Sequence, residues 1–192
     1  MKKLVLSMVP LTFAALLTLQ VDVPSAAADH QEEFTVLTVD VALDGNTYRQ
    51  NDVDPSEGTA TFSRGDTLVV DGTIYPGHTL PSGTANNDPN APGGIGKMIC
   101  RGAYLEGSPE LNTAPFLTFV TELYLLPDHT KSLIADGFGP NTGVSARRAV
   151  LGGTGQFKDA VGELREENLG FNRTGACNLR MTFKLKKAGP GH

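Results

Sequence analysis

The chain has 192 residues, of which 40% are hydrophobic, and it carries 16 lysines and arginines against 21 aspartates and glutamates. This apolar content, with a formal net charge of only −5, excludes a disordered chain, which combines few apolar residues with a large net charge. A net-acidic chain also lacks the basic surface that neutralises phosphates, so the composition disfavours nucleic-acid binding.

The first 28 residues have the pattern of an export signal. Two lysines follow the initiating methionine, an apolar run covers residues 4–21, and three alanines at 26–28 provide the small residues that a signal peptidase reads. Because the run approaches the roughly 20 residues that span a bilayer, a membrane anchor is the competing interpretation. Pro10 and the alanine-rich end favour cleavage. We therefore expect a cut after Ala28, a secreted mature chain, and no membrane span once the signal is removed.

The remainder of the chain, residues 29–187, is predicted to form one domain, followed by a flexible tail at 188–192. Apolar, β-branched runs separated by Gly, Pro, Asn or Asp predict about eight strands in it. These strands are residues 34–43, 67–75, 97–105, 116–126, 132–138, 144–151, 157–165 and 177–185. Regular short strands with turn signals indicate an all-β sandwich or barrel. If eight strands close, the interior is just wide enough for side chains or one small ligand.

The last predicted strand shows the two-residue period of a half-buried antiparallel strand most clearly. One face of this strand carries Cys177, Leu179, Met181, Phe183 and Leu185, and the other face carries polar or charged residues. We expect the apolar face, with Phe183, to point into the interior.

Three stretches are predicted to be loops or turns. Residues 46–58 are polar and are expected to be exposed, whereas residues 81–96 have almost nothing to bury and form either a binding lid or a disordered loop. The glycine-rich run at 152–155 is followed by a strand pattern rather than a helix. We therefore expect a tight turn there and not a phosphate-binding loop.

The sequence motifs do not predict a metal site or a catalytic triad. The four histidines lie near the ends of the mature chain or after turn signals, and the usual zinc, redox and nucleophile motifs are missing. Cys100 and Cys177 could pair in an exported protein, although they fall on strands that are not neighbours in an up-and-down barrel. Two buried thiols are the favoured alternative, and the question stays open at this point.

Charged residues interrupt several predicted strands, and about two thirds of them are expected to face solvent. These residues are Asp40, Asp71, Arg101, Glu122, Asp136, Arg147, Arg148 and Glu163. Glu122 shares its face of the strand with Val120 and Tyr124, so burial would raise the pKa of its carboxyl group. Such a group could act as a general acid or base, with Tyr104 and Tyr124 as phenol donors beside it.

The run RAVLGGTGQF, from Arg148 to Phe157, resembles a glycine motif shared by dirigent proteins. The stretches 65–81 and 168–185 look like bacterial proteins of the allene oxide cyclase barrel-like superfamily, and the likeness covers most of residues 34–186. The resemblance implies an all-β fold, an eight-stranded antiparallel up-and-down β-barrel that is commonly a homotrimer, with a hydrophobic lumen and no cofactor. Members of the superfamily bind an apolar small molecule and direct its cyclisation or stereoselective coupling by shaping its conformation.

The dirigent motif is not fully conserved in this chain. The motif's second arginine is replaced by Val161, and the position of its first arginine is occupied by Ala146. Arg148 lies two residues after Ala146 and so keeps the facing parity of the family's arginine. The resemblance therefore assigns that arginine's role to Arg148.

The expected site lies in the barrel lumen. Its catalytic candidates are Glu122, Arg148 and Asp40, and its substrate-binding candidates are Tyr104, Tyr124, Arg101 and Phe183. The carboxyl groups would move a proton, and the arginines would stabilise developing negative charge. The alternatives are a non-catalytic, lipocalin-like binding protein, with its in-strand charges pointing outward, and a structural extracellular protein whose barrel is filled by side chains.

Overall fold

The computed structural model describes residues 34–57, 63–105, 118–125, 130–139 and 145–187. All of these residues belong to one compact unit, Glu32–His192. The predicted export signal and its cleavage site at Ala28 lie outside the described residues. Within the described part of the chain, no helix has the length and apolar character needed to cross a membrane.

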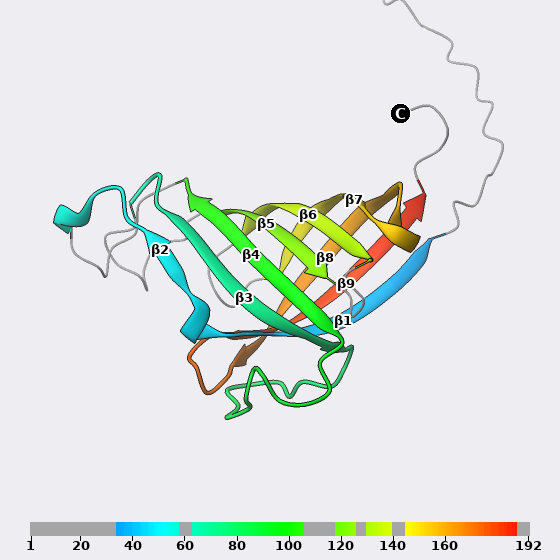
Figure 1. The fold of residues 1–192 in the computed structure, drawn as a ribbon, viewed down its shortest axis with the longest axis horizontal. Helices are drawn as coiled ribbons and strands as arrows, with labels where there is room; N and C mark the ends of the chain where they lie inside the picture. The colour runs from blue at the N-terminus through cyan, green and yellow to red at the C-terminus, as the bar shows by residue number, and fades with distance from the viewer. Residues whose placement is uncertain (1–33, 58–62, 106–117, 126–129, 140–144, 188–192) are drawn as a thin grey trace, which may run out of the picture. The chain divides into compact units, whose positions relative to one another are not determined.

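Eight antiparallel strands close into a β-barrel, which confirms the predicted fold (Figure 1). The strands are β1 (Thr35–Leu43), β3 (Thr67–Pro76), β4 (Gly96–Tyr104), β5 (Thr118–Leu125), β6 (Ser132–Gly139), β7 (Ala146–Gly153), β8 (Ala160–Phe171) and β9 (Cys177–Lys187). From β3 to β9 each strand pairs with the next in the chain, and β1 completes the ring by pairing with both β9 and β3. This closure removes the free sheet edges that would expose unpaired backbone groups.

The segment at 46–58, predicted to be an exposed loop, contains regular structure. The 3-10 turn η1 (Gly45–Thr47) follows β1, and the short strand β2 (Arg49–Asn51) then pairs with the beginning of β3. A second 3-10 turn, η2 (Pro55–Glu57), comes next. The prediction of a loop is wrong at β2 because a polar strand of 3 residues carries no hydrophobic period.

Strand β8 is longer than the sequence predicts. It runs to Phe171 instead of ending at Arg165, and it pairs with β9 along this length with an irregularity between Asn168 and Gly170. The three residues that follow Arg165 are polar, so they resemble a loop in the sequence. Their strand conformation comes from backbone pairing with β9, which a hydrophobic pattern does not report.

Alternate side chains fill most of the barrel interior, and every barrel strand contributes buried apolar residues. The large apolar side chains that are fully buried are Phe183, Ile74, Met98, Leu133, Leu164 and Met181. A small apolar cavity of about 10 Å³ remains, which is room for about one water molecule. It is lined by Leu37, Val39, Ile74, Tyr124, Leu133 and Phe183.

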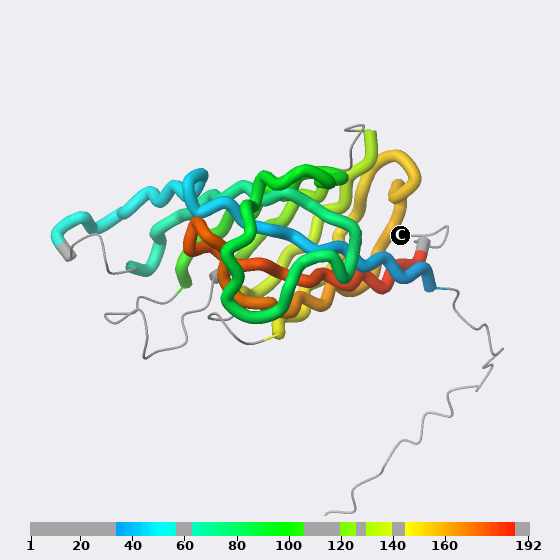
Figure 2. Tube along the Cα trace, turned by 90° about the horizontal axis from the view of Figure 1, so that it is seen from below, coloured from blue at the N-terminus to red at the C-terminus, as the bar shows by residue number. Residues whose placement is uncertain are grey.

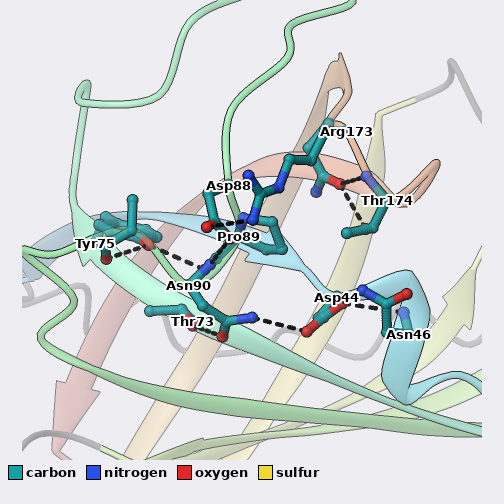
Figure 3. A network of polar contacts seen from close by, with 11 residues as sticks. Asp44, Asn46, Thr73, Tyr75, Asp88, Pro89, Asn90, Arg173 and Thr174 are labelled. Atoms are coloured by element: carbon teal, nitrogen blue, oxygen red, sulfur yellow. Dashed lines mark hydrogen bonds and ion pairs between the residues drawn. The ribbon is translucent and has the colours of Figure 1, made fainter.

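The long loop between β3 and β4 packs against the outer face of β1 and β9 (Figure 2). The Tyr75 hydroxyl on β3 donates to the carbonyl oxygens of Pro89, at 3.0 Å, and Ala91, at 2.9 Å. The side-chain amide of Asn90 donates to Asp44 Oδ2 at 2.8 Å (Figure 3). The sequence analysis left open whether this loop is a binding lid or a disordered segment. In the structure, hydrogen bonds hold the loop against the outer face of the barrel.

The glycine run at 152–155 forms the predicted tight turn between β7 and β8. It leads into the 3-10 turn η3 (Gly155–Phe157), and the chain then continues as β8 rather than as an α-helix. Gly155 has a φ of +60°, in the left-handed region that favours glycine. A Cβ atom at Gly153 would collide with the carbonyl oxygen of Ser132.

Cys100 and Cys177 are free thiols, as the favoured alternative predicts. They lie on β4 and β9, which are not adjacent in the sheet. Burial raises the pKa of both thiols, so neither is activated as a thiolate.

Candidate functional site

A cluster of ionisable side chains interrupts the apolar lumen. On β5, Val120, Glu122 and Tyr124 are buried, whereas the residues between them are more exposed. On β7, Arg148 lies on the buried face between two exposed neighbours. Successive residues of a strand point to opposite faces of the sheet, so these buried side chains point into the barrel. Glu122, at 1% exposed, and Arg148, at 5%, therefore lie on the inner face of the barrel.

Arg148 reaches across β6 to contact acids on two other strands. Its Nη1 atom lies 2.8 Å from Glu122 Oε2 on β5 and 2.5 Å from Glu166 Oε2 on β8. Strand β6 lies between β5 and β7, and its Gly137 packs against the Arg148 side chain. A Cβ atom at Gly137 would lie 3.2 Å from Arg148 Cγ, so the glycine leaves the space that the arginine crosses.

The variant Gly137→Ala tests this packing. We expect it to destabilise the protein by about 2–3 kcal/mol, because alanine is strained at the φ of +155° and its methyl group presses on Arg148. Gly152→Ala is the matched control, since Gly152 has a φ of +156° but no described atom within 4 Å of its Cβ position. We expect the control to cost only about 1 kcal/mol in urea unfolding at pH 7. Equal losses for the two variants would contradict the packing role of Gly137.

Glu166 completes the cluster, and the sequence analysis did not identify it. Its side chain is 14% exposed, against 1% for Glu122 and 3% for Arg148, so it is the member closest to solvent. It is also hydrogen-bonded to Glu122. The sequence prediction ended the strand one residue before Glu166. A two-residue period counted onward from Leu164, which is buried in the lumen, would have placed Glu166 on the inner face.

The cluster keeps the Glu122 carboxyl group protonated at neutral pH. Burial raises the pKa of Glu122 to about 8, and the neighbouring Glu166 carboxylate adds to the effect. The Arg148 guanidinium and the Tyr124 hydroxyl act in the opposite direction without cancelling the rise. A buried carboxyl group that is neutral at pH 7 can donate a proton to a bound molecule.

Tyr124 joins the ionisable cluster to the apolar cavity. Its hydroxyl group donates to Glu122 Oε2 at 2.8 Å and also contacts the sulfur of Met181. Its ring lines the apolar cavity and meets Phe183 edge to face, with ring centroids 4.9 Å apart. The structure therefore brings the two predicted substrate contacts Tyr124 and Phe183 together beside Glu122. Burial raises the pKa of Tyr124, so its hydroxyl group stays a donor.

Tyr104 also faces the lumen but belongs to a different level of the barrel. It lies four residues beyond Cys100 on β4, and Cys100 is paired with Glu122, so the backbones of Tyr104 and the cluster are roughly 13 Å apart along the strand. Tyr104 is 4% exposed and is hydrogen-bonded to Tyr48. Burial raises the pKa of both phenols.

Asp40 is buried outside the lumen, so the prediction of a lumenal catalytic carboxylate at this position is wrong. On β1 the residues Val39 and Val41 belong to the core, and Asp40 lies between them on the outer face. It accepts hydrogen bonds from Arg180 Nε at 2.9 Å and from the backbone N–H of Leu80 at 2.9 Å. Burial acts to raise the pKa of Asp40, but these hydrogen bonds outweigh it and lower the pKa. The carboxylate therefore holds the β3–β4 loop to the barrel wall.

The variant Asp40→Asn should show that this role is structural. We expect a loss of about 2–3 kcal/mol in urea unfolding at pH 7, because the charge-assisted bonds to Arg180 are lost while the shape is kept. The loss should shrink below a pH of about 3.8, the ordinary pKa of the group, because a lowered pKa contributes stability only above that range. Faster amide exchange at Leu80 should accompany the loss. An Asp40→Asn variant as stable as wild type would contradict the assignment.

Arg101 points away from the lumen, which also corrects its predicted role as a substrate contact. Arg101 is exposed. Its two neighbours in the chain, Cys100 and Gly102, face the interior, so Arg101 lies on the outer face of β4. The same alternation places every other in-strand charge named in the sequence analysis, apart from Glu122 and Arg148, on the outer face. Among the described residues, no group of three or more His, Cys, Asp or Glu side chains could hold a metal ion.

The closed barrel with its largely apolar lumen has the dirigent-like and cyclase-like barrel fold, as the resemblance implies. A pterocarpan synthase dirigent protein is similar with a TM-score of 0.55 and 14% identity, over 90% of this chain and 100% of that one. Pyocyanin demethylase is similar with a TM-score of 0.54 and 16% identity, over 79% and 100% of the two chains. The Diels-Alderase AbmU from Streptomyces koyangensis is similar with a TM-score of 0.50 and 15% identity, over 81% and 64%.

These identities are low, so the likeness shows the fold and not the reaction. No family model and no curated protein matches the chain in sequence.

Proposed function

We propose that the barrel binds an apolar small molecule in its lumen and directs the cyclisation or stereoselective coupling of that molecule without a cofactor. The observation that supports this most strongly is Glu122, a carboxyl group only 1% exposed, with a raised pKa, inside an otherwise largely apolar lumen. Stability alone does not favour such a group, because apolar side chains of similar volume often replace a buried ion pair at no cost. Its presence therefore favours a chemical role.

In the proposed mechanism, Glu122 gives its proton to the bound molecule and becomes a carboxylate. Arg148 Nη1 and the Tyr124 hydroxyl group, each 2.8 Å from Glu122 Oε2, stabilise that negative charge. Once the ring has closed, the product gives a proton back to the Glu122 carboxylate, so no net proton is taken up in the cycle. Glu166 is hydrogen-bonded to Glu122 and is nearer to solvent, so it lies on the side from which water can reach the pair. The barrel contributes by excluding water and by holding the reacting ends of the molecule together.

Two of the three neighbours reported above have names that fit the reaction class, whereas the name of pyocyanin demethylase does not. One neighbour is a pterocarpan synthase dirigent protein, and another is a Diels-Alderase. A Diels-Alder reaction closes a ring, and the protein's main task in such a reaction is to hold the reactants in the reactive geometry.

One observation favours the alternative of a filled, non-catalytic barrel. The apolar cavity beside Tyr124 has room for about one water molecule, so a ligand would have to displace side chains. Met98 and Met181 are fully buried in the lumen, and unbranched methionine side chains adapt most easily to a guest. The proposal therefore requires that these two side chains move when a ligand binds.

The same methionines allow a direct test of ligand binding. They are the only methionines after residue 28, so ¹³C-methyl labelling of the mature chain gives two NMR signals that both report on the lumen. Titration with a panel of apolar aromatic and terpenoid compounds should shift both signals. If no compound shifts either signal, the barrel is structural and the proposal fails.

A compound that the protein converts then allows a test of catalysis. We expect Glu122→Gln to slow the conversion by about 100-fold or more while still binding the compound, because the amide fills the same space but cannot donate the proton. Glu163→Gln is the control, since Glu163 pairs with Arg147 on the exposed outer face. Unchanged turnover in Glu122→Gln would contradict the role of Glu122.

We also propose that the chain is exported and that the mature protein forms the homotrimer implied by the resemblance. Protein recovered from the medium should begin at Asp29, which N-terminal sequencing would detect. Exposed apolar residues on the outer faces of β6 and β7, Ile134, Phe138 and Leu151, support the idea of a contact between copies. Light scattering should give the trimer mass for wild type and a lower mass for Leu151→Lys.

A further inference from the structure

Arg148 uses only one end of its guanidinium group for the two acids. Nη1 makes the contacts with both Glu122 and Glu166. Nε is buried, and among the described residues it has no hydrogen-bond partner. The Arg148 residue as a whole is only 5% exposed.

Arg180, on the outer wall of the same barrel, shows how a guanidinium group is used when it only pairs with an acid. It donates two hydrogen bonds to the same carboxylate, from Nε to Asp40 Oδ1 at 2.9 Å and from Nη2 to Asp40 Oδ2 at 3.2 Å. This is a bidentate pair. The Nε of Arg148 has no such partner among the described residues, although the side chain is more deeply buried than that of Arg180. A buried donor left without an acceptor weakens a fold, and buried polar groups in proteins are normally paired. Arg148 therefore has a free donor in the lumen, which suits an acceptor atom of a bound molecule.

We propose that the lumenal ligand is an apolar molecule with a carbonyl group, whose oxygen accepts a hydrogen bond from Arg148 Nε. This inference rests on the proposed function and narrows its substrate class. The apolar body of the molecule would occupy the region beside Tyr124 and Phe183, where the cavity lies. Tyr124 belongs both to that region and to the cluster, since its hydroxyl group bonds Glu122.

The charges of the cluster favour a neutral carbonyl over a carboxylate. The single positive charge of Arg148 already faces two acids, Glu122 and Glu166. A ligand carboxylate would bring a third acidic group into a buried site with one cation, and buried like charges repel strongly. A ketone or enone oxygen accepts the Nε–H bond without adding charge. Hydrogen bonding by the guanidinium group would also draw electron density toward that oxygen, which activates an adjacent double bond for ring closure.

The test compares ligands that differ only at the acceptor. The probes are 1-indanone labelled with ¹³C at the carbonyl carbon, indane, and indane-1-carboxylate, each titrated against wild type with the Met98 and Met181 methyl signals as the readout. We expect 1-indanone to bind about 10-fold or more tightly than indane, as a hydrogen bond from a charged donor allows. Its carbonyl resonance should move downfield on binding, and indane-1-carboxylate should bind more weakly than 1-indanone.

The matched variants are Arg148→Lys and Arg147→Lys. Lysine keeps the positive charge beside Glu122 and Glu166 but has no second donor in the place of Nε. We expect Arg148→Lys to lose the preference for 1-indanone over indane and the downfield shift, whereas Arg147→Lys, on the exposed outer face, keeps both. The comparison within wild type remains decisive if Arg148→Lys does not fold.

The outcomes separate this inference from the proposed function. If indane binds as tightly as 1-indanone, or the carboxylate binds best, the carbonyl assignment is wrong while the lumenal binding stands. If neither indane nor any other apolar probe shifts the methionine signals, the proposed function fails and the carbonyl assignment fails with it. An unchanged ligand preference in a folded Arg148→Lys variant would also overturn the assignment.

Discussion

Replacing Arg148 with leucine is expected to destabilise the protein by about 3 kcal/mol at pH 7, one of the largest effects of any single substitution in the barrel. The guanidinium group is the only described side chain that pairs with both Glu122 and Glu166, and it is 3% exposed at the side chain. Leucine fills part of the space but leaves two neighbouring acids without their cation. The loss should grow as the pH rises, because ionised carboxyl groups depend on Arg148 more than protonated ones do.

Urea unfolding at pH 6, 7 and 9 would measure this effect, with Arg147→Leu as the control. Arg147 is the next residue in the chain, but its side chain is 69% exposed and pairs with Glu163 on the outer face. An exposed pair contributes about 0–1 kcal/mol, so the control should stay close to wild type. Similar losses in the free energy of unfolding for the two variants would show that the buried cluster stabilises the fold no more than an exposed ion pair does.

The stability of wild type is expected to fall as the pH rises from 5 to 9, and Glu122→Gln should remove most of that fall. The pKa of Glu122 is raised from an ordinary 4.5 to about 8 in the folded protein. The raised pKa of Glu122 stabilises the folded protein fully below pH 4.5. This contribution to the free energy of unfolding is lost as the pH rises from 4.5 through 8. A shift of this size corresponds to roughly 5 kcal/mol. Glutamine keeps the shape of the neutral acid and does not titrate.

The comparison is made by urea unfolding at pH 5, 7 and 9. At pH 5 the variant should match wild type to within about 1 kcal/mol, and at pH 9 it should be clearly the more stable of the two. The control Glu163→Gln should follow the wild-type curve, because Glu163 lies on the outer face. Parallel curves for wild type and Glu122→Gln would mean that Glu122 has an ordinary pKa.

The barrel could be predicted from the sequence because its signals are local. Hydrophobic alternation and turn residues locate each of the eight barrel strands, and the glycine turn before β8 and the family resemblance agree with closure. The sequence analysis missed β2 because this strand, Arg49–Asn51, pairs with β3 through its backbone and buries no apolar face. The prediction also missed the end of β8, because residues 166–168 are polar and hide the apolar Leu169 that follows them.

The site was partly predictable, and the errors have one cause. Glu122 was placed in the lumen by counting alternate residues from its apolar neighbours, and Arg148 by the facing parity that it shares with the arginine of the resembling family. The same count puts Asp40 on the outer face, because its neighbours Val39 and Val41 face the core. It also puts Arg101 on the outer face of β4, because both of its neighbours face the interior. Assigning these two residues to the lumen relied on their charge and not on their parity.

Other features of the site depend on strands that are distant in sequence. The contact between Glu122 and Arg148 spans β6, and it depends on Gly137 having no side chain in the way. A sequence pattern shows the face on which a side chain lies, but it does not show which side chains meet across a closed lumen. The Nε atom of Arg148, on which the carbonyl proposal depends, could be recognised only once that geometry was known.

The most direct test of the central claim is an NMR titration of Glu122 itself. The side-chain carboxyl carbon, labelled with ¹³C and assigned by its disappearance in Glu122→Gln, reports the protonation of this group from pH 4 to pH 10. We predict a midpoint near 8, which would establish a buried proton donor in the lumen at neutral pH. A midpoint near the ordinary value of 4.5 would contradict the account, because Glu122 would then be a carboxylate with no proton to give.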